Sequence, residues 1–295
     1  LGDFDEATTG PVSIDLVRLA TSIRIASRMR GWSARSLWTR FLQGYIAALE
    51  DESFTAPEPR FASRARGRFA DDHAALLMRS ESLLTPLDAR VSAEVEVALA
   101  SYVEMLRRRR PDLDARWFEV VTIGSHQLGV GSRRATNCLI RTRGPTDDPS
   151  DDLILEAKEV TRNPLAECLP ISRRTDPLRI LVADARLAYA PFRDVGFVEV
   201  NGRPYWVHEW VNDYVELDVS DPEVDQDVIG EVLYDVGVQL GHGHPRELGD
   251  PYETELRSDL SRYVVERADT LWGFSARLAN TLWSAWQELS RAREP

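Results

Sequence analysis

LILEAKEV, residues 153–160, is a short apolar run with Lys158 near its end. Its branched apolar residues favour a strand. Lys158 is the only lysine among 36 Lys and Arg residues. An ammonium is a compact point charge on a flexible stem, whereas a guanidinium is a wide planar fork. A chain that otherwise uses arginine would keep a lysine where the fork does not fit, such as beside phosphate; the alternatives are chance retention or an edge-strand lysine that opposes aggregation.

The neighbouring sequence predicts that this strand belongs to a small antiparallel sheet. A glycine-containing loop separates the first two strands, and an Asn-Gly turn at 201–202 joins the last two. A single helix, 176–190, follows the third strand and begins at Asp176 and Pro177. The five β-type runs are 117–123, 135–142, 153–160, 196–200 and 204–210.

Helical patterns occupy both ends of the chain. The first helix is expected over 12–31, capped by Ser13 and ended by Gly31. Its apolar stripe at helical spacing consists of Ile14, Val17, Ile25 and Met29. Further helices are expected from Ser33 and from Ser92.

From Asp221 onward the sequence is helical again, and Trp272, Trp283 and Trp286 are expected to lie in the core. The fold class is therefore α+β, with a β-rich lobe between two parts of a helical lobe. The expected boundaries are 1–116 for the first helical part, 117–220 for the β-rich lobe with its connector, and 221–295 for the second helical part.

Composition limits the partners and the compartment. A net charge of -12 argues against nonspecific nucleic-acid binding, and the lack of an 18-residue apolar run argues against a membrane span. Cys138 and Cys168, without a CxxC motif, favour a reducing cytoplasmic setting. Arginine clusters at 60–68 and 107–110 are typical of helix faces and C-termini, with polyanion binding as the alternative.

Two motifs suggest phosphate and metal chemistry. Gly129, Val130, Gly131 and Ser132 form a loop whose N–H groups could reach phosphate, although a hairpin also favours glycine and Arg134 stands where a third glycine would complete GxGxxG. Asp3, Asp5 and Glu6 cluster before the first helix. Such carboxylates suit Mg²⁺, which keeps water and substrate phosphates as further ligands, or they form an acidic helix cap.

The order of these elements resembles the small lobe of protein-kinase-like folds, with a glycine loop between the first two strands and a lysine on the third. DFD…GP…DL at the start of the chain is similar to a stretch of aminoglycoside-phosphotransferase-like kinases in which the first Asp binds metal. By this resemblance Asp3 is a metal ligand, Asp5 a second one, and Asp15 a buried structural acid. Lys158 would hold the α- and β-phosphates of ATP.

The chain also resembles an uncharacterised bacterial family, domain of unknown function 2252, through DFDEATTGPVSIDLVRLATS, GVGSRRATNCLI, LILEAKE and RILVADARL. This family carries its motifs in the same order, which implies a circularly permuted kinase-like fold. The family's acidic partner for the lysine aligns near Ala183, so Asp184 or Glu159 would take that role. The connector residues Glu209, Trp210 and Val211 would face adenine.

These resemblances imply an ATP-binding, Mg²⁺-dependent phosphotransferase acting on a small molecule or a protein. The alternative is a catalytically inactive nucleotide-binding or interaction module. The family's GDxHxxNFG element, which would supply a catalytic base, does not occur before DFDE in this sequence, and we expect the chain to begin inside a longer protein. His242 and His244 follow a helix where a kinase places its catalytic loop, but a helix end explains them as well. His73, His126 and His208 are isolated in the sequence and are expected to be structural.

Overall fold

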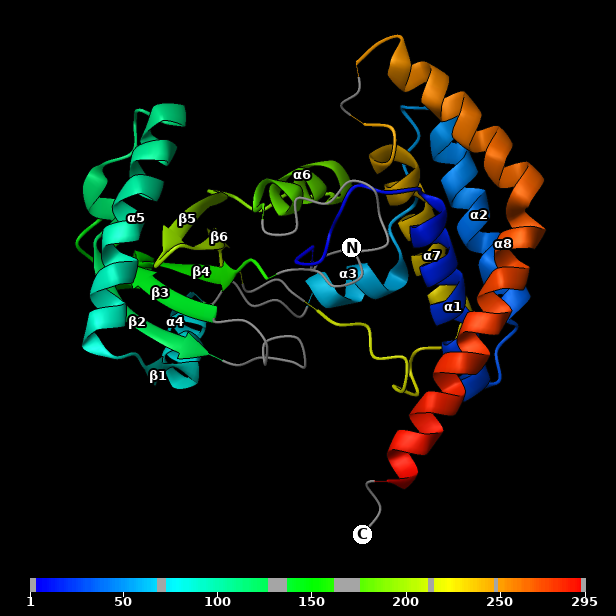
Figure 1. Ribbon diagram of the computed structural model, residues 1–295, viewed down its shortest axis with the longest axis horizontal. Helices are drawn as coiled ribbons and strands as arrows, with labels where there is room; N and C mark the ends of the chain where they lie inside the picture. The colour runs from blue at the N-terminus through cyan, green and yellow to red at the C-terminus, as the bar shows by residue number, and fades with distance from the viewer. Residues whose placement is uncertain are drawn as a thin grey trace.

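The first and last stretches of the chain fold together. Figure 1 shows the helices that they form side by side in one part of the molecule: α1 (Ser13–Arg30), α2 (Ala34–Glu50), α7 (Gln226–Gly243) and α8 (Tyr252–Arg291). The computed structural model describes residues 4–67, 73–126, 137–161, 176–211, 215–246 and 249–292.

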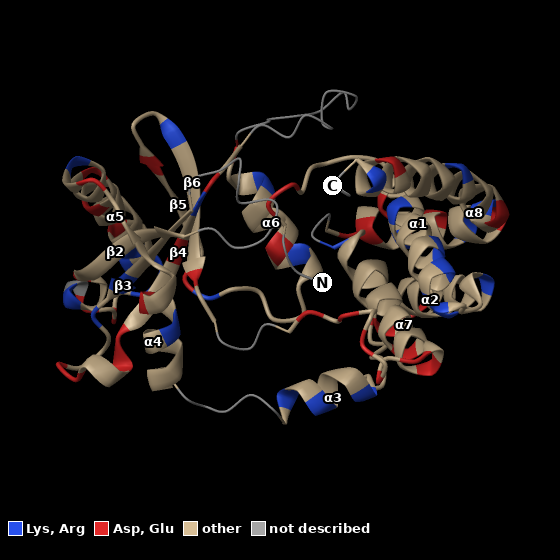
Figure 2. Ribbon diagram, turned by 90° about the horizontal axis from the view of Figure 1, so that it is seen from below, with Lys and Arg blue, Asp and Glu red and all other residues tan. Residues whose placement is uncertain are grey.

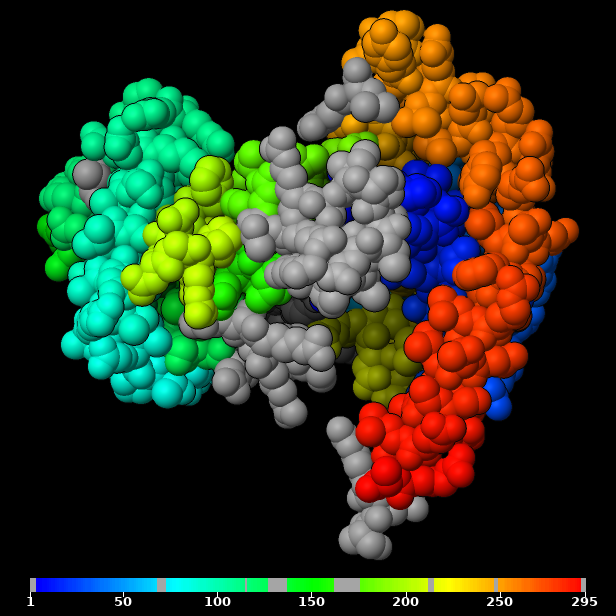
Figure 3. All heavy atoms as spheres, viewed as in Figure 1, coloured from blue at the N-terminus to red at the C-terminus, as the bar shows by residue number. Residues whose placement is uncertain are grey.

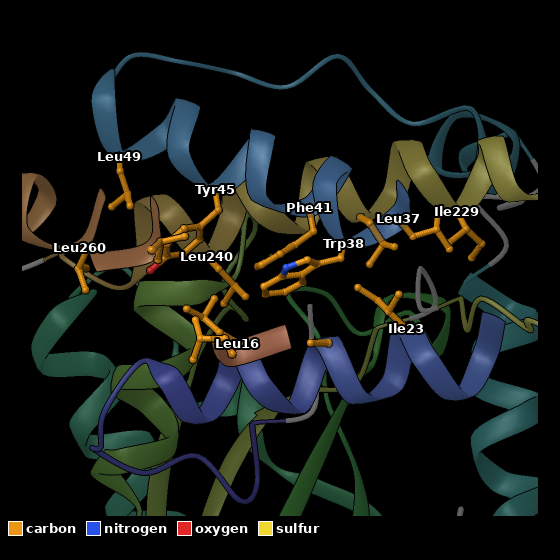
Figure 4. Close-up of a cluster of buried hydrophobic side chains, with 14 of the residues drawn as sticks. Leu16, Ile23, Leu37, Trp38, Phe41, Tyr45, Leu49, Ile229, Leu240 and Leu260 are labelled. Carbon is orange, nitrogen blue, oxygen red and sulfur yellow. The ribbon is translucent and has the colours of Figure 1, made fainter. Parts of the chain in front are cut away.

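Large aromatic side chains of α2 fill the centre of this helical part (Figure 4). Trp38, Phe41 and Tyr45 are fully buried, at the spacing that places side chains on one helix face. The ring of Trp38 stacks on Trp272 of α8, with centroids 5.9 Å apart. Leu16 of α1 reaches the same core from the opposite side (Figure 4). The core therefore joins segments from both ends of the sequence.

Glycine lets α2 and α7 approach until their backbones touch. A Cβ atom on Gly44 of α2 would lie 2.0 Å from the carbonyl oxygen of Tyr234, and one on Gly237 of α7 would lie 2.3 Å from the carbonyl oxygen of Phe41. Both distances are shorter than any real contact, so neither position accepts a larger side chain without movement. These two helices form the most extensive helix–helix contact in the described chain.

Local signals predicted some helix ends and not others. The Ser33 side chain caps α2 by accepting a hydrogen bond from the N–H of Ser36, and Gly31 ends α1 with a φ of 72°. Ser13, in contrast, is the first helical residue of α1 and not its cap. The expected apolar stripe of α1 is also wrong, because Ile14 and Met29 are exposed.

The buried residues of α1 are instead Leu16, Ala20, Thr21, Ile23 and Ser27. Both sets of residues have helical spacing, and packing against α2 and α8 selects one of them. Packing against neighbouring helices therefore determines which face of α1 is buried, because helical periodicity fits both sets of residues.

Within the described residues, six strands form one antiparallel sheet in the order β1-β2-β3-β4-β6-β5, where five were expected. The additional strand has only two residues and pairs with the edge of β2. Trp117 and Phe118 lie in a 3₁₀ turn, η1 (Ala115–Phe118), and not in a strand. The strands are β1 (Thr85–Pro86), β2 (Val120–His126), β3 (Asn137–Thr142), β4 (Leu153–Glu159), β5 (Gly196–Val200) and β6 (Arg203–Glu209).

One face of the sheet packs against α5 (Ala89–Arg109), and both lie opposite the helical part in Figures 1 and 2. Helix α5 begins after the cap Asp88 and not at Ser92 as expected. The expected single helix, α6 (Leu178–Leu187), does follow the third long strand. The sheet thus packs against α5 as well as α6, and α5 contacts the sheet although its residues fall before the expected boundary at 117.

Two short helices complete the described chain. Helix α4 (His73–Leu83) contacts the second face of the sheet through Leu76 and Leu77. Helix α3 (Arg60–Arg66) is held to α7 by an ion pair between Arg60 and Glu231. None of the described helices is long and apolar enough to cross a bilayer.

The C-terminal part of α8 projects from the body of the molecule (Figure 3). Trp286 is exposed there, which corrects its expected core position, whereas Trp272 packs against the core. The predicted Arg cluster 107–110 lies at the C-terminal end of α5, where positive charge complements the helix dipole.

Candidate functional site

The two faces of the sheet differ in chemistry. Residues paired across neighbouring strands point to the same face. The register pairs Lys158 with Asn137 on one side and with Trp206 on the other, and it pairs Glu156 with Leu139 and His208. These side chains therefore share the face opposite α5. At the corresponding positions of β3 and β4, the α5 face carries apolar residues together with Thr142 and, at the end of β4, Glu159.

Lys158 lies where this polar face meets the first residues of the chain. Its Nζ atom is 3.4 Å from Oδ2 of Asp5 and 3.8 Å from Oε2 of Glu156. Nζ also lies 5.6 Å from the centre of the Trp206 ring, within range of a cation–π contact. The Lys158 side chain is 21% exposed, so it is held by the protein but remains accessible to a ligand.

Glu156 is a buried carboxylate between two imidazole rings. Oε1 lies 3.0 Å from Nε2 of His126, and Oε2 lies 3.2 Å from Nε2 of His208. Burial favours the neutral acid, but the contacts with His126 and His208 and the charge of Lys158 outweigh it and lower the pKa of Glu156 far below its ordinary value. Glu156 is therefore a fixed negative charge two residues before Lys158.

Aromatic rings enclose one side of this charge. The ring of His208 stacks on Trp206 and lies tilted against Phe192, with centroid distances of 4.2 Å to each. Nδ1 of His208 lies 2.8 Å from the carbonyl oxygen of Glu209. These contacts fix the ring plane of His208, so its Nε2 is held toward Glu156.

Helix α6 fastens the acidic segment at the start of the chain onto the sheet. Arg179 donates hydrogen bonds through Nη1 to the carbonyl oxygens of Asp5 and Ala7, at 2.6 and 2.7 Å. Phe4 packs in a small apolar cluster with Ile180 and Trp206. Burial lowers the pKa of Arg179, while the charges of Asp5 and Glu6 act in the opposite direction. The position of Asp5 beside Lys158 is thus built by backbone anchoring and apolar packing together.

Several buried polar atoms around Lys158 and Glu156 have no hydrogen-bond partner in the described chain. They include Nδ1 of His126, Oδ1 of Asn137 and Nε1 of Trp206. Asn137 and Trp206 flank Lys158 directly in the sheet register. Buried polar groups are normally satisfied, so this concentration marks a place where water or a polar ligand would restore the missing bonds.

The donor set agrees with a bound cation only in part. Within the described residues, no three His, Cys, Asp or Glu side chains converge as a metal site, and Asp3 lies outside those residues. Mg²⁺ needs only one or two protein carboxylates when phosphate and water supply its other ligands. Asp5, 38% exposed and beside Lys158, fits the role of one such ligand.

The expected phosphate loop, Gly129, Val130, Gly131 and Ser132, lies outside the described residues, as does Cys168. In the sequence this loop lies between β2 and β3. The strand ends on either side of it carry His126 and Asn137.

The connector at the end of β6 is described as far as Val211. The N–H of Trp210 donates a 2.8 Å hydrogen bond to the carbonyl oxygen of Ile154. The Trp210 side chain is half-buried and packs against the cluster that includes Leu76 and Leu77 of α4. Ordinary packing therefore accounts for Trp210. Glu209 and Val211 are half-buried beside it.

The acids expected to pair with Lys158 make other contacts. Asp184 of α6 is buried and accepts a hydrogen bond from the N–H of Phe192, and burial raises its pKa. Glu159 forms an ion pair with Arg203 at 3.3 Å. Among the described residues, the carboxylates within ion-pair distance of Lys158 include Asp5, from the acidic segment, and Glu156, from the same strand.

Asp15 differs from its expected buried position. Its side chain is 47% exposed, and Oδ2 lies 3.5 Å from Nε2 of His244. Nδ1 of His244 lies 2.7 Å from the hydroxyl of Tyr45. His242 contacts the carbonyl oxygen of Phe54. Both histidines at the end of α7 thus have structural contacts, as a helix end predicts.

A separate cavity of about 640 Å³ lies in the helical part, beside His242 and Asp235 of α7. Its arginines are paired with protein groups: Arg257 with Glu253 at 3.0 Å and Arg66 with Glu58 at 2.6 Å. None of the side chains around Lys158 lines it.

The contribution of His126 and His208 was missed in the sequence, where they look isolated. They come together because β2 and β6 lie on either side of β3 and β4, an arrangement of strands far apart in the chain. One signal was present in the sequence. Trp206 and His208 alternate along β6, as do Glu156 and Lys158 along β4, which places each pair on one face.

The profile of the family described as "Uncharacterized protein conserved in bacteria (DUF2252)" matches residues 1–71 and 59–292, which confirms the expected family. Searches of curated proteins and of solved structures gave no match. Because the two matched segments cover both the acidic segment and the sheet, the chain belongs to this bacterial family, domain of unknown function 2252.

Proposed function

We propose that the chain binds ATP with Mg²⁺ and transfers a phosphoryl group, using a kinase-like fold in circularly permuted order. The observation that carries this proposal is the 3.4 Å contact between Nζ of Lys158 and Oδ2 of Asp5. In protein kinases a strand lysine and a metal-binding aspartate meet at the nucleotide phosphates. In this chain, Lys158 on the third long strand and Asp5 in the DFD segment would supply the same two functions, phosphate binding and metal binding.

Each residue has a specific task in this proposal. Lys158 donates hydrogen bonds to the α- and β-phosphate oxygens and neutralises part of their charge. Asp5, together with Asp3, holds Mg²⁺, which supplies further charge neutralisation at the phosphates. The 129–132 loop contacts the phosphates through backbone N–H groups, and residues 209–211 face adenine. Phosphoryl transfer depends mainly on positioning and electrostatic stabilisation, so these residues carry much of the rate.

The acceptor is a hydroxyl compound, either a small molecule or a side chain of a protein. Cysteine usage favours a cytoplasmic location for this activity.

A second candidate is an inactive nucleotide-binding module. It is favoured by α6, where Ala183 and the Phe192-bound Asp184 replace the helix acid that a kinase lysine contacts. Such a module would bind nucleotide through Lys158 without transferring phosphate.

The test measures thermal stabilisation by ATP and ADP, with and without Mg²⁺, and ADP release with a panel of acceptors. Lys158→Ala should abolish the Mg²⁺-ATP stabilisation, while Arg203→Ala, an exposed charge at the far end of β6, should keep it. Stabilisation without turnover supports the inactive module. Equal nucleotide binding by wild type and Lys158→Ala would refute both candidates.

A further inference from the structure

We infer that Glu156 is the positioning residue of Lys158: a carboxylate of the lysine's own strand, fixed by His126 and His208, sets where the ammonium points. The catalytic meaning of this inference rests on the proposed function, but the positioning itself does not.

Exposure separates the tasks of the two carboxylates beside Lys158. The Asp5 side chain is 38% exposed, whereas that of Glu156 is 7% exposed. An arriving cation can therefore compete with Lys158 for Asp5, and an arriving phosphate can compete with Asp5 for Lys158, but neither can reach Glu156 in the same way. Glu156 remains beside Lys158 whether or not a ligand is bound, and a positioning group needs this property.

The strand makes this relationship rigid. Glu156 and Lys158 are two residues apart on β4, so both side chains point to the same face. Strand β4 lies inside the sheet, bonded to β3 on one side and β6 on the other. The distance between the two Cα atoms is consequently set by the pleat and does not depend on how any helix packs.

The histidines fix the other end of the contact. Each carboxylate oxygen of Glu156 has its own imidazole, His126 at 3.0 Å and His208 at 3.2 Å. His126 is on β2 and His208 on β6, so the carboxylate is held from both flanks of the sheet. Rotation of the Glu156 side chain away from Lys158 would leave a buried carboxylate apart from all three groups, which is costly.

This arrangement differs from a kinase in which the lysine pairs with a helix acid and the helix must be placed correctly. Here α6 carries Ala183 and Asp184, and Asp184 is engaged with Phe192. The contact between Glu156 and Lys158 is therefore formed within the sheet and does not require a movement of α6.

Because Lys158 is the only lysine, its environment can be read directly. Reductive methylation with ¹³C-formaldehyde keeps the positive charge and gives one side-chain methyl resonance besides that of the terminal amine; Lys158→Arg identifies which is which. In the folded wild type the Lys158 resonance should differ in chemical shift from free dimethyl-lysine. Glu156→Gln, which keeps the size and removes the charge, should move the resonance most of the way to the free value.

Two controls make this result specific. Asp152→Asn removes another buried carboxylate, directly before β4, which pairs with Arg141 at 2.6 Å, and this variant should leave the Lys158 resonance unchanged. Asp5→Asn should shift it only slightly. If Asp5→Asn releases the resonance and Glu156→Gln does not, the inference is wrong. Should Glu156→Gln fail to fold, Glu156→Asp keeps the charge on a shorter stem and must still displace the resonance.

Mg²⁺-ATP binding gives the functional arm. Glu156→Gln should weaken it about tenfold, the loss expected for one charge-assisted contact, while Asp152→Asn should not change it. If wild type binds no nucleotide, the proposed function fails, yet the methyl resonance still tests Glu156. If nucleotide binds equally to wild type and Glu156→Gln, and the resonance does not move, only the positioning role fails.

Discussion

The Nζ atom of Lys158 lies 3.4 Å from Oδ2 of Asp5, although about half of the chain separates the two residues. The contact is supported from both sides, because Arg179 holds the backbone of Asp5 and Phe4 packs against Trp206. The start of the chain is thereby attached to the sheet at the lysine. A ligand bound there would contact both the start of the chain and the sheet.

The first prediction concerns the energetic coupling of this pair. Lys158→Ala and Asp5→Asn should each abolish Mg²⁺-ATP stabilisation, and the double variant should lose no more than either single one, since the two groups act on the same ligand. Thermal-shift assays and isothermal titration calorimetry measure the loss of Mg²⁺-ATP binding in the single and double variants. Stabilisation that survives in part in each single variant and falls further in the double variant would show that Asp5 and Lys158 contribute independently.

The second prediction concerns acid stability. The pKa of Glu156 in the folded chain lies below the ordinary value of about 4.3, so its ionised form stabilises the fold above that pH. This stabilisation should be lost as the pH falls through the folded-state pKa. Glu156→Gln should lower the free energy of unfolding at pH 7 by about 3 kcal/mol, the typical cost of breaking a buried charge pair.

Urea unfolding of both proteins between pH 7 and pH 3 provides the measurement. The difference between wild type and Glu156→Gln should shrink toward low pH. A difference that stays constant with pH would mean that Glu156 is not preferentially ionised in the fold.

The third prediction concerns the anchoring of residues 4–7. Arg179→Gln removes the guanidinium that donates to the carbonyl oxygens of Asp5 and Ala7. Limited proteolysis should then cut near the start of the chain at least several times faster, and Mg²⁺-ATP affinity should fall. Arg203→Gln, which removes an exposed arginine of β6, is the control and should leave the cleavage rate unchanged. Equal protection in both variants would contradict an anchoring role for Arg179.

The fourth prediction concerns the contact between α2 and α7. Gly44→Ala places a Cβ against the carbonyl oxygen of Tyr234 and should cost about 1–3 kcal/mol, the usual price of overpacking. Gly273→Ala on α8 meets nothing within 4 Å and should be neutral or stabilise by up to about 1 kcal/mol. Chemical denaturation compares them. A Gly44→Ala protein as stable as wild type would show that these helices separate easily.

The elements that were predictable have local causes. Strand 196–200 has the predicted ends, and it is followed by the Asn-Gly turn with positive φ at Asn201 and Gly202. Ser33 caps its helix as expected. The buried face of α1 was not predictable, because two stripes share its periodicity and only contact with α2 and α8 distinguishes them.

The candidate site divides in the same way. Lys158 and the acidic segment were identifiable from residue type and the order of elements, and their proximity is confirmed for Asp5. The partners of Glu156 were not identifiable, because His126 and His208 reach it only through the pairing of four strands. Strand order and register are properties of the whole sheet, and no short stretch of sequence contains them.

The touching backbones of α2 and α7 have a mechanical consequence. Because no side chain separates Gly44 from the backbone of Tyr234, neither helix can tilt without moving the other, and the two helices form one rigid unit. This unit includes Tyr45 of α2 and His244 at the end of α7, and His244 contacts Asp15 of α1. Any opening or closing between sheet and helices therefore moves this block as a unit, and flexing must occur in the segments that lead into it.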